Sequence, residues 1–286
     1  MFKRSYRFRL CSRPMFFAQI VIAAFIVLCL GSPAALAQTV RPARQDFDGD
    51  GKSDIVFSNR RTGDVTVLFM NSTAIARQSF IVQGMDANWS IIRSGDFDGD
   101  GKSDLLWRNL QTGDVVAWFM DGATTRSWGT VISGLNTNWF VAGVGDLNGD
   151  GKADLVWENA VTGDVVVWFM NGATVQSWAT LFSGPNQEWL VAAVGDLDGD
   201  GKSDLIWENI NSGDVVVWLM NGITIKTWAT ISTGVFGPWF LGGVLDLDGD
   251  GAYDLLWQNS VSGAIVGWLM NGATVKGTGF ITPLLP

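Results

Sequence analysis

A nine-residue motif recurs along this chain at a fixed interval of 50 residues, and this repeat constrains the fold more than any other feature. The first copy, Asp-Phe-Asp-Gly-Asp-Gly-Lys-Ser-Asp, begins at Asp46, and close copies begin at Asp96, Asp146, Asp196 and Asp246 without insertion or deletion. A fixed period of this length indicates one supersecondary unit that has been copied, here five times.

Each unit is predicted to contain four short strands. In the second repeat we expect strands at 105–107, 115–120 and 124–132, followed by 139–145, which leads into the next acidic motif. Asp121-Gly122, and Asn-Gly at 171, 221 and 271, are typical of two-residue hairpins. No stretch has helical periodicity, and the nearly continuous apolar strands predict sheets that are buried on both faces. The pattern predicts an all-β fold, a β-propeller of five four-stranded blades; an open β-solenoid is the alternative.

Closure of the ring depends on the N-terminal segment. A closed ring needs residues 38–45 as the innermost strand of the first blade, although this segment contains Pro42. We expect a monomer if the ring closes in this way. Otherwise the ring stays open or closes between two chains.

The first 37 residues have the features of an export signal. A basic start with five Lys and Arg and no acidic residue precedes an apolar run, Met15 to Leu30, and then Ala35-Leu36-Ala37. This order predicts cleavage after Ala37 and a secreted chain in the extracellular space, in the periplasm or at the cell surface. An uncleaved membrane anchor is the alternative, but 16 residues are fewer than the roughly 20 that span a bilayer. The predicted divisions are a leader at 1–37, a candidate closing strand at 38–45, and repeats at 46–95, 96–145, 146–195, 196–245 and 246–286.

Composition excludes several chemistries. The chain has no histidine, and its two cysteines, Cys11 and Cys29, lie in the predicted leader, so the mature chain has no Ser-His-Asp triad, thiol nucleophile or disulfide. Without the leader, 14 Lys and Arg face 28 Asp and Glu, a net charge of −14. Such a charge repels phosphate backbones, so nucleic acid is not an expected partner.

The acidic motif has the spacing of a calcium loop. Oxygen ligands at positions 1, 3 and 5, a turn at glycine in position 6 and a backbone carbonyl at position 7 suit Ca²⁺. Position 12, a tryptophan in four repeats, lacks the glutamate of an EF-hand, so the last carboxylate is expected at position 9. Up to five Ca²⁺ ions are predicted, the third site being the weakest because Asn148 replaces an aspartate; Mg²⁺, or a turn that binds nothing, is the alternative. The candidate metal ligands are Asp46, Asp48, Asp50, Lys52, Asp54; Asp96, Asp98, Asp100, Lys102, Asp104; Asp146, Asn148, Asp150, Lys152, Asp154; Asp196, Asp198, Asp200, Lys202, Asp204; Asp246, Asp248, Asp250, Ala252 and Asp254, with position 7 contributing its carbonyl.

On these loops the chain resembles the FG-GAP/VCBS repeats of bacterial secreted proteins, which are similar to the blades of integrin α-subunits. The motifs at 46–54 and 96–104 and their three later counterparts carry the resemblance, which covers residues 46–286. It implies a β-propeller with calcium in the loop between the first two strands of each blade. The family includes adhesins, lectins and modules attached to polysaccharide enzymes, so it leaves the ligand open.

All 15 tryptophans fall into four columns of the repeat. We expect the columns of Trp107, Trp118 and Trp128 to pack between blades, since such rings usually supply buried area. The fourth column follows the least repetitive loops, which carry Asn and Asp side chains, and it is the candidate for stacking on sugars; its members are Trp89, Trp139, Trp189 and Trp239.

The predicted function is a secreted calcium-binding module for adhesion, with carbohydrate or a cell-surface glycan as ligand. A propeller that binds a cell-surface protein in a structural role is the alternative. An enzyme that degrades polysaccharide is disfavoured, and no catalytic residue is assigned, because catalytic groups would break the repeat symmetry and no separate catalytic segment stands out. No membrane span is expected in the mature chain.

Overall fold

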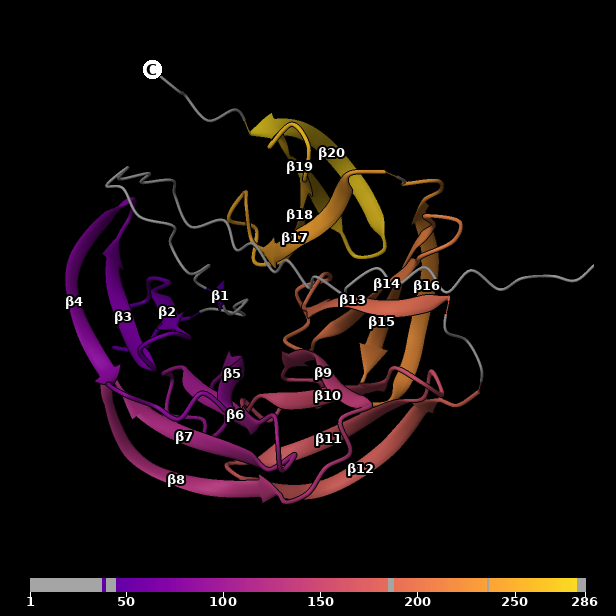
Figure 1. The fold of residues 1–286 in the computed structure, drawn as a ribbon. Helices are drawn as coiled ribbons and strands as arrows, with labels where there is room; N and C mark the ends of the chain where they lie inside the picture. The colour runs from indigo at the N-terminus through magenta and orange to yellow at the C-terminus, as the bar shows by residue number, and fades with distance from the viewer. Residues whose placement is uncertain (1–37, 40–44, 185–187, 236, 282–286) are drawn as a thin grey trace, which may run out of the picture.

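The computed structural model describes residues 38–39, 45–184, 188–235 and 237–281, and the predicted leader lies outside this part. Five antiparallel sheets of four strands follow one another around an arc, from β1–β4 to β17–β20 (Figure 1). The predicted five-bladed propeller with a 50-residue repeat is therefore confirmed. No helix within the described ranges has the length and apolar character needed to cross a membrane.

The strands of each sheet run from the innermost to the outermost in chain order. Sheet one contains β1 (Gln38–Thr39), β2 (Ile55–Asn59), β3 (Asp64–Asn71) and β4 (Ala74–Val82). Sheet two contains β5 (Trp89–Gly95), β6 (Asp104–Asn109), β7 (Val115–Asp121) and β8 (Thr124–Ile132). Sheet three contains β9 (Trp139–Gly145), β10 (Asp154–Asn159), β11 (Val165–Asn171) and β12 (Thr174–Phe182). Sheet four contains β13 (Trp189–Gly195), β14 (Asp204–Asn209), β15 (Val215–Asn221) and β16 (Thr224–Ser232). Sheet five contains β17 (Trp239–Leu245), β18 (Asp254–Asn259), β19 (Ile265–Asn271) and β20 (Thr274–Ile281).

The hairpin between the last two strands of each sheet forms at the predicted dipeptide. Gly122 has φ 62°, and the equivalent glycines of sheets three to five have φ between 57° and 63°. This left-handed conformation is accessible to glycine without a steric penalty, which explains the Asp-Gly and Asn-Gly pairs. Sheet one has Ser72 at this position with φ 59°, the one positive φ of a non-glycine residue in the described part of the chain.

The N-terminal segment joins the first sheet in its own register. Thr39 pairs with Phe57, whereas in sheet three Trp139 pairs with Asn159, and Val141 pairs with Trp157. By its place in the repeat, Thr39 is equivalent to Trp139, so β1 is shifted by two residues.

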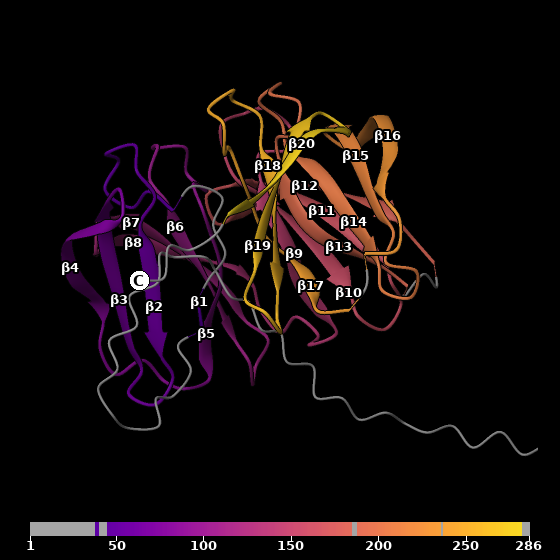
Figure 2. The ribbon, with the colours of Figure 1, turned by 90° about the horizontal axis from the view of Figure 1, so that it is seen from above.

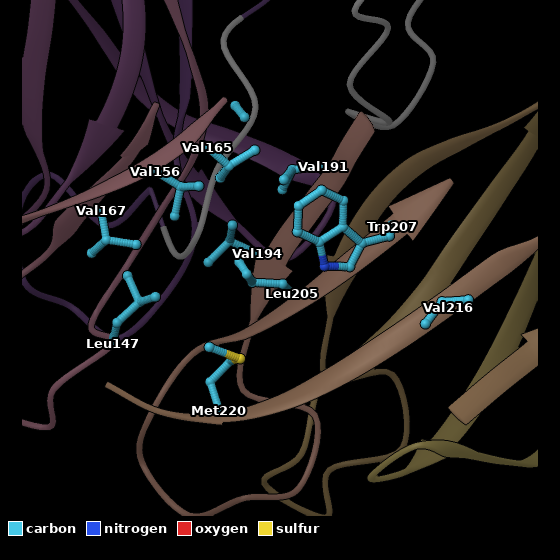
Figure 3. Close-up of a cluster of buried hydrophobic side chains, with 11 residues drawn as sticks. Leu147, Val156, Val165, Val167, Val191, Val194, Leu205, Trp207, Val216 and Met220 are labelled. Carbon is cyan, nitrogen blue, oxygen red and sulfur yellow. The ribbon is translucent and has the colours of Figure 1, made fainter. Parts of the chain in front are cut away.

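Buried apolar side chains fill the four junctions between consecutive sheets. At the junction of sheets three and four, Val156 and Val167 lie opposite Val194, Leu205 and Trp207, all within one cluster (Figure 3). Equivalent clusters join sheets one and two, two and three, and four and five. Among the described residues, no such cluster joins sheet five to sheet one, and Figures 1 and 2 show these two sheets as the ends of the arc.

Each junction also contains two backbone hydrogen bonds from the following sheet. Ser103 donates its N–H to the carbonyl of Asp46 at 2.7 Å, and Gly122 donates to that of Phe47 at 2.8 Å. The same pair recurs at the next three junctions. In the described part of the chain, the carbonyls of Asp246 and Leu247 accept no equivalent bond, so the fifth acidic loop lacks the support that the other four receive.

The expectation that every strand is buried on both faces is wrong for the outermost strands. All six residues of β10 are buried, but most residues of β8, β12 and β16 are exposed or half-buried. The prediction took apolar composition as a sign of complete burial. Blades radiate from a centre, so neighbouring sheets separate toward the periphery and leave their outer strands in contact with water.

Candidate metal centres and an aromatic pocket

The first aspartate of each motif folds the loop around its own carboxylate. Gly49 and Gly51 donate their N–H groups to the two carboxylate oxygens of Asp46, each at 2.7 Å. The same two bonds form in the other four loops, at 2.6–3.0 Å. Position 1 therefore orders the backbone, which brings positions 3 and 5 to the same side of the turn.

The aspartate at position 9 ties the loop to the third strand of its own sheet. Asp104 accepts N–H bonds from Phe97 at 3.0 Å and from Met120 at 2.8 Å, one on each oxygen. Burial raises the pKa of Asp104 to about 7, although these two bonds act in the opposite direction. Burial also raises the pKa values of Asp154 and Asp204 to about 7. Position 9 thus has a structural role that the motif alone did not reveal.

Four loops bring three carboxylates together as a cation site requires. In each, one ligand atom per residue lies within 4.8 Å of the others. The groups are Asp46, Asp48 and Asp50; Asp96, Asp98 and Asp104; Asp196, Asp198 and Asp204; and Asp246, Asp248 and Asp250. In the first two, the Oδ1 atoms of Asp48 and Asp98 are buried without a hydrogen-bond partner. Buried oxygens that lack a donor fit a hard cation, so these residues can hold a divalent metal ion.

The third loop differs because Asn148 occupies position 3. Its amide donates to Asp150 at 3.3 Å, a contact that an aspartate could not make. Asp146, Asp150 and Asp154 remain as its carboxylates, so the loop keeps its oxygen atoms with one charge fewer.

Cations from the outermost strands reach the acidic loops of four sheets, and the sequence analysis missed them. Arg126 contacts Asp98 at 2.8 Å and Asp100 at 2.6 Å. Lys226 contacts Asp198 and Asp200 at 2.7 and 2.6 Å, Lys276 contacts Asp248 and Asp250, and Arg77 contacts Asp48 at 2.9 Å. The sequence signal was the basic residue shared by positions 126, 226 and 276. No local sequence pattern could place that side chain beside an acidic loop 26–28 residues earlier.

The lysines at position 7 do not all act on their own loop. Lys52 pairs with Asp50 at 2.8 Å, but Lys102, Lys152 and Lys202 extend to the side chains of Asp121, Asn171 and Asn221 at the hairpin of the same sheet. These last three lysines therefore act at the hairpin, whereas the outer-strand cations contact the acidic loop.

The tryptophan columns lie at different depths. Trp107, Trp157, Trp207 and Trp257 are buried, and each lies 4.7–5.2 Å, centroid to centroid, from the half-buried tryptophan on the next strand. Trp128, Trp178 and Trp228, which we expected to pack between blades, are instead 66, 67 and 62% exposed. They lie on the outermost strands, where the sheets have separated. The predicted sugar-binding column, Trp89, Trp139, Trp189 and Trp239, is half-buried at the starts of the innermost strands.

A pocket of about 290 Å³ brings one member of each of the four tryptophan columns together at the junction of sheets three and four. Trp189, Trp207, Trp218 and Trp228 contribute from sheet four, and Phe182 of β12 faces them, with its ring centroid 6.5 Å from that of Trp207. The complete lining is Phe182, Trp189, Trp207, Val216, Trp218, Ile225 and Trp228. No charged side chain is part of it. A smaller pocket of about 60 Å³ includes Trp89.

These features define a five-bladed propeller with an acidic loop in every blade. Residues 46–107 and 96–157 match the model of the FG-GAP-like repeat, and the same motif recurs in all five blades. The chain therefore contains FG-GAP-like repeats within a five-bladed propeller. Such a propeller suggests a protein-binding module.

Comparison with solved structures extends the similarity in fold. A chain of the nidogen/laminin complex aligns with a TM-score of 0.53 at 15% identity, covering 81% of this chain and 78% of that one. An auxiliary nutrient binding protein from Bacteroides thetaiotaomicron aligns with a TM-score of 0.49 at 9% identity, covering 83% and 56%. At these identities the similarity concerns the fold alone. No curated protein sequence matches the chain.

Proposed function

We propose that this protein is an exported propeller that binds calcium in its acidic loops and carbohydrate in the aromatic pocket between sheets three and four. The observation that supports the ligand class is the lining of that pocket: four tryptophans and one phenylalanine without a charged side chain. The proposal assigns the protein a binding role and no catalytic step.

The pocket suits the apolar face of a sugar ring. Ring C–H groups pack against indole faces, while the hydroxyls at the rim remain in water. The chain carries a net charge of −9, which favours a neutral ligand over an acidic one. Trp228 is 62% exposed, so the platform is accessible before any ligand arrives.

Calcium has a structural role in this proposal. The aspartates at positions 1, 3 and 5 supply oxygen ligands, and the ion neutralises carboxylates that otherwise repel each other. With a Kd of about 0.1 mM and about 1 mM free calcium, each site contributes about 1.4 kcal/mol to the free energy of unfolding. Millimolar calcium is an extracellular condition, so the calcium role and the export role of this proposal depend on each other.

A glycan array in calcium buffer, followed by calorimetry on the best ligand, tests the proposal. Trp228→Ala is expected to weaken binding about 30-fold, the equivalent of a 2 kcal/mol contact. Its effect on stability should stay below about 1 kcal/mol, since the ring is mostly exposed.

Trp128→Ala is the matched control, because it removes an equally exposed ring from the equivalent strand of sheet two, where Val82 stands in place of Phe182. Equal weakening by both variants, or an array without a glycan ligand, would leave a protein-binding propeller as the better assignment.

A further inference from the structure

The outer-strand cations and the acidic loops vary together from blade to blade. In sheets one, two, four and five, a basic residue, Arg77, Arg126, Lys226 or Lys276, contacts the carboxylate at loop position 3, and in the last three of these sheets it also contacts position 5. Sheet three has Gln176 where its neighbours have Arg126 and Lys226. This is also the sheet whose loop has Asn148 at position 3.

The two substitutions in sheet three, Asn148 and Gln176, offset each other in the net charge of the loop. Sheets one, two, four and five each place four carboxylates, at positions 1, 3, 5 and 9, against one outer-strand cation, a net charge of −3. The third sheet has three carboxylates and no outer-strand cation, which is again −3. Counted over these positions alone, without the lysines at position 7, all five loops have the same net charge, although one of them is built from different residues.

We propose that Arg77, Arg126, Lys226 and Lys276 are counter-charges that occupy the loop carboxylates in the metal-free protein and compete with a divalent cation for them. This inference rests on the proposed calcium function. It changes the expectation for the third loop. Asn148 removes an attractive charge, but Gln176 removes the competitor, so the third site binds calcium about as tightly as the others.

The competition follows from the distances. The ammonium nitrogen of Lys226 lies 2.7 Å from an oxygen of Asp198 and 2.6 Å from one of Asp200. Calcium binds carboxylate oxygens at about 2.3–2.6 Å, so an ion that uses these two Oδ2 atoms needs the position that the ammonium holds. At the dielectric constant of water, a divalent ion about 5 Å from a retained ammonium is repelled by an amount equal to a roughly tenfold change in Kd. Calcium must therefore displace the lysine.

Competition of this kind can be measured as a change in the Kd of individual calcium-binding events. In the chelator-treated full chain titrated with calcium by calorimetry, Lys226→Gln is expected to convert one of five binding events into one roughly tenfold tighter. Gln176→Lys is expected to weaken one event by a similar factor, because it gives the third loop the competitor it lacks.

Lys202→Gln is the matched control for net charge. Lys202 belongs to the same loop, but its side chain bonds to Asn221 and to neither Asp198 nor Asp200. Its replacement adds the same negative charge without freeing a ligand, so it should shift Kd less than threefold. A shift equal to that of Lys226→Gln would overturn direct competition in favour of a general electrostatic effect.

The remaining outcomes separate this inference from the proposed function. Calcium binding that neither Lys226→Gln nor Gln176→Lys alters would overturn the inference and leave the calcium role intact. The absence of any calcium binding, in the wild type and in both variants, would overturn the calcium role and the inference together. Melting in excess chelator shows that each variant is folded, and the two substitutions in different sheets keep the test valid if one of them does not fold.

Discussion

The junctions inside the propeller and the free edge of its last sheet differ at one position of the repeat. Gly95, Gly145 and Gly195 end the innermost strands of sheets two to four, and a Cβ at any of them would lie within 3 Å of a side chain of the next sheet. At Gly145, the added atom would lie 2.2 Å from Oγ of Ser203. Sheet five has Leu245 at this position, and it is 39% exposed. The internal edges are thus shaped for close approach by a following sheet, and the last edge is not.

The first sheet also differs from the internal sheets, at the position that lies against the preceding sheet in each internal junction. Ser103, Ala153 and Ser203 are buried at the internal junctions, whereas Ser53, at the same position of the repeat, is exposed. Sheet one also has Phe57, Leu68 and Gln78 where sheet two has three tryptophans. The terminal sheets therefore carry altered outer surfaces, as terminal repeats of stacked arrays commonly do.

Calcium removal is expected to have the largest effect and to distinguish the fifth loop from the other four. If calcium fills the five loops as proposed, sites of about 1.4 kcal/mol each would together contribute about 7 kcal/mol, which rivals the whole stability of many domains. Excess chelator should lower the Tm sharply, and magnesium should restore it poorly. By hydrogen exchange, the fifth loop should lose protection first, because among the described residues no N–H group of another sheet bonds to the carbonyls of Asp246 and Leu247. A Tm that chelator does not change would contradict the metal assignment.

The second prediction compares an internal aromatic residue with its counterpart in the first sheet. Trp157 is 1% exposed in the junction of sheets two and three, so Trp157→Ala should lower the free energy of unfolding by about 3–5 kcal/mol. Phe57, the equivalent residue of sheet one, is only half-buried. Phe57→Ala should therefore cost about 1–2 kcal/mol in urea denaturation. Equal losses would mean that the first sheet is covered as completely as an internal one.

The repeat allowed the strands to be predicted closely, because period, hairpin dipeptides and apolar runs are local signals. β8, β9 and the Asp-Gly turn have the predicted bounds or lie within one residue of them. The exposure of Trp128 was not predictable in this way. Strand periodicity assigns a side chain to a face of the sheet but gives no distance from the centre of the propeller. The contact of Lys226 with Asp198 was missed because its partners are brought together only by the sheet.

The third prediction concerns a buried acid that the last sheet replaces with an amide. Burial raises the pKa of Glu158 to about 7, partly offset by the N–H bond from Val191, and sheet five has Gln258 at this position. A folded-state pKa above the unfolded value means that the stability contribution is complete below pH of about 4.5 and is lost as the pH rises through about 7. Glu158→Gln should therefore stabilise the protein at pH 8, by up to about 3 kcal/mol, and leave it nearly unchanged at pH 4.

The fourth prediction places the residue of the free edge into an internal junction. Gly145→Leu forces a side chain into the space of Ser203, so either the backbone or the neighbouring sheet must move. Overpacking of this kind should cost about 1–3 kcal/mol in chemical denaturation. Gly134→Leu does not serve as a control, because φ 67° at Gly134 adds backbone strain. Leu110→Ala does, since it alters an exposed side chain outside the junction and should have little effect.

The smallest change in stability is expected for the reverse exchange, Leu245→Gly. The side chain is 39% exposed in the described part of the structure, so its loss should cost less than about 1 kcal/mol. The variant would nevertheless give the last edge the glycine of the internal junctions and allow N–H groups such as that of Ser53 to approach the carbonyls of Asp246 and Leu247. Contact between a last edge and a first sheet is head-to-tail, so it can continue from molecule to molecule. Sedimentation over a range of concentrations should therefore show association that the wild type lacks. If both proteins sediment alike, Leu245 is not what keeps the edge unpaired, and the altered surface of the first sheet becomes the better explanation.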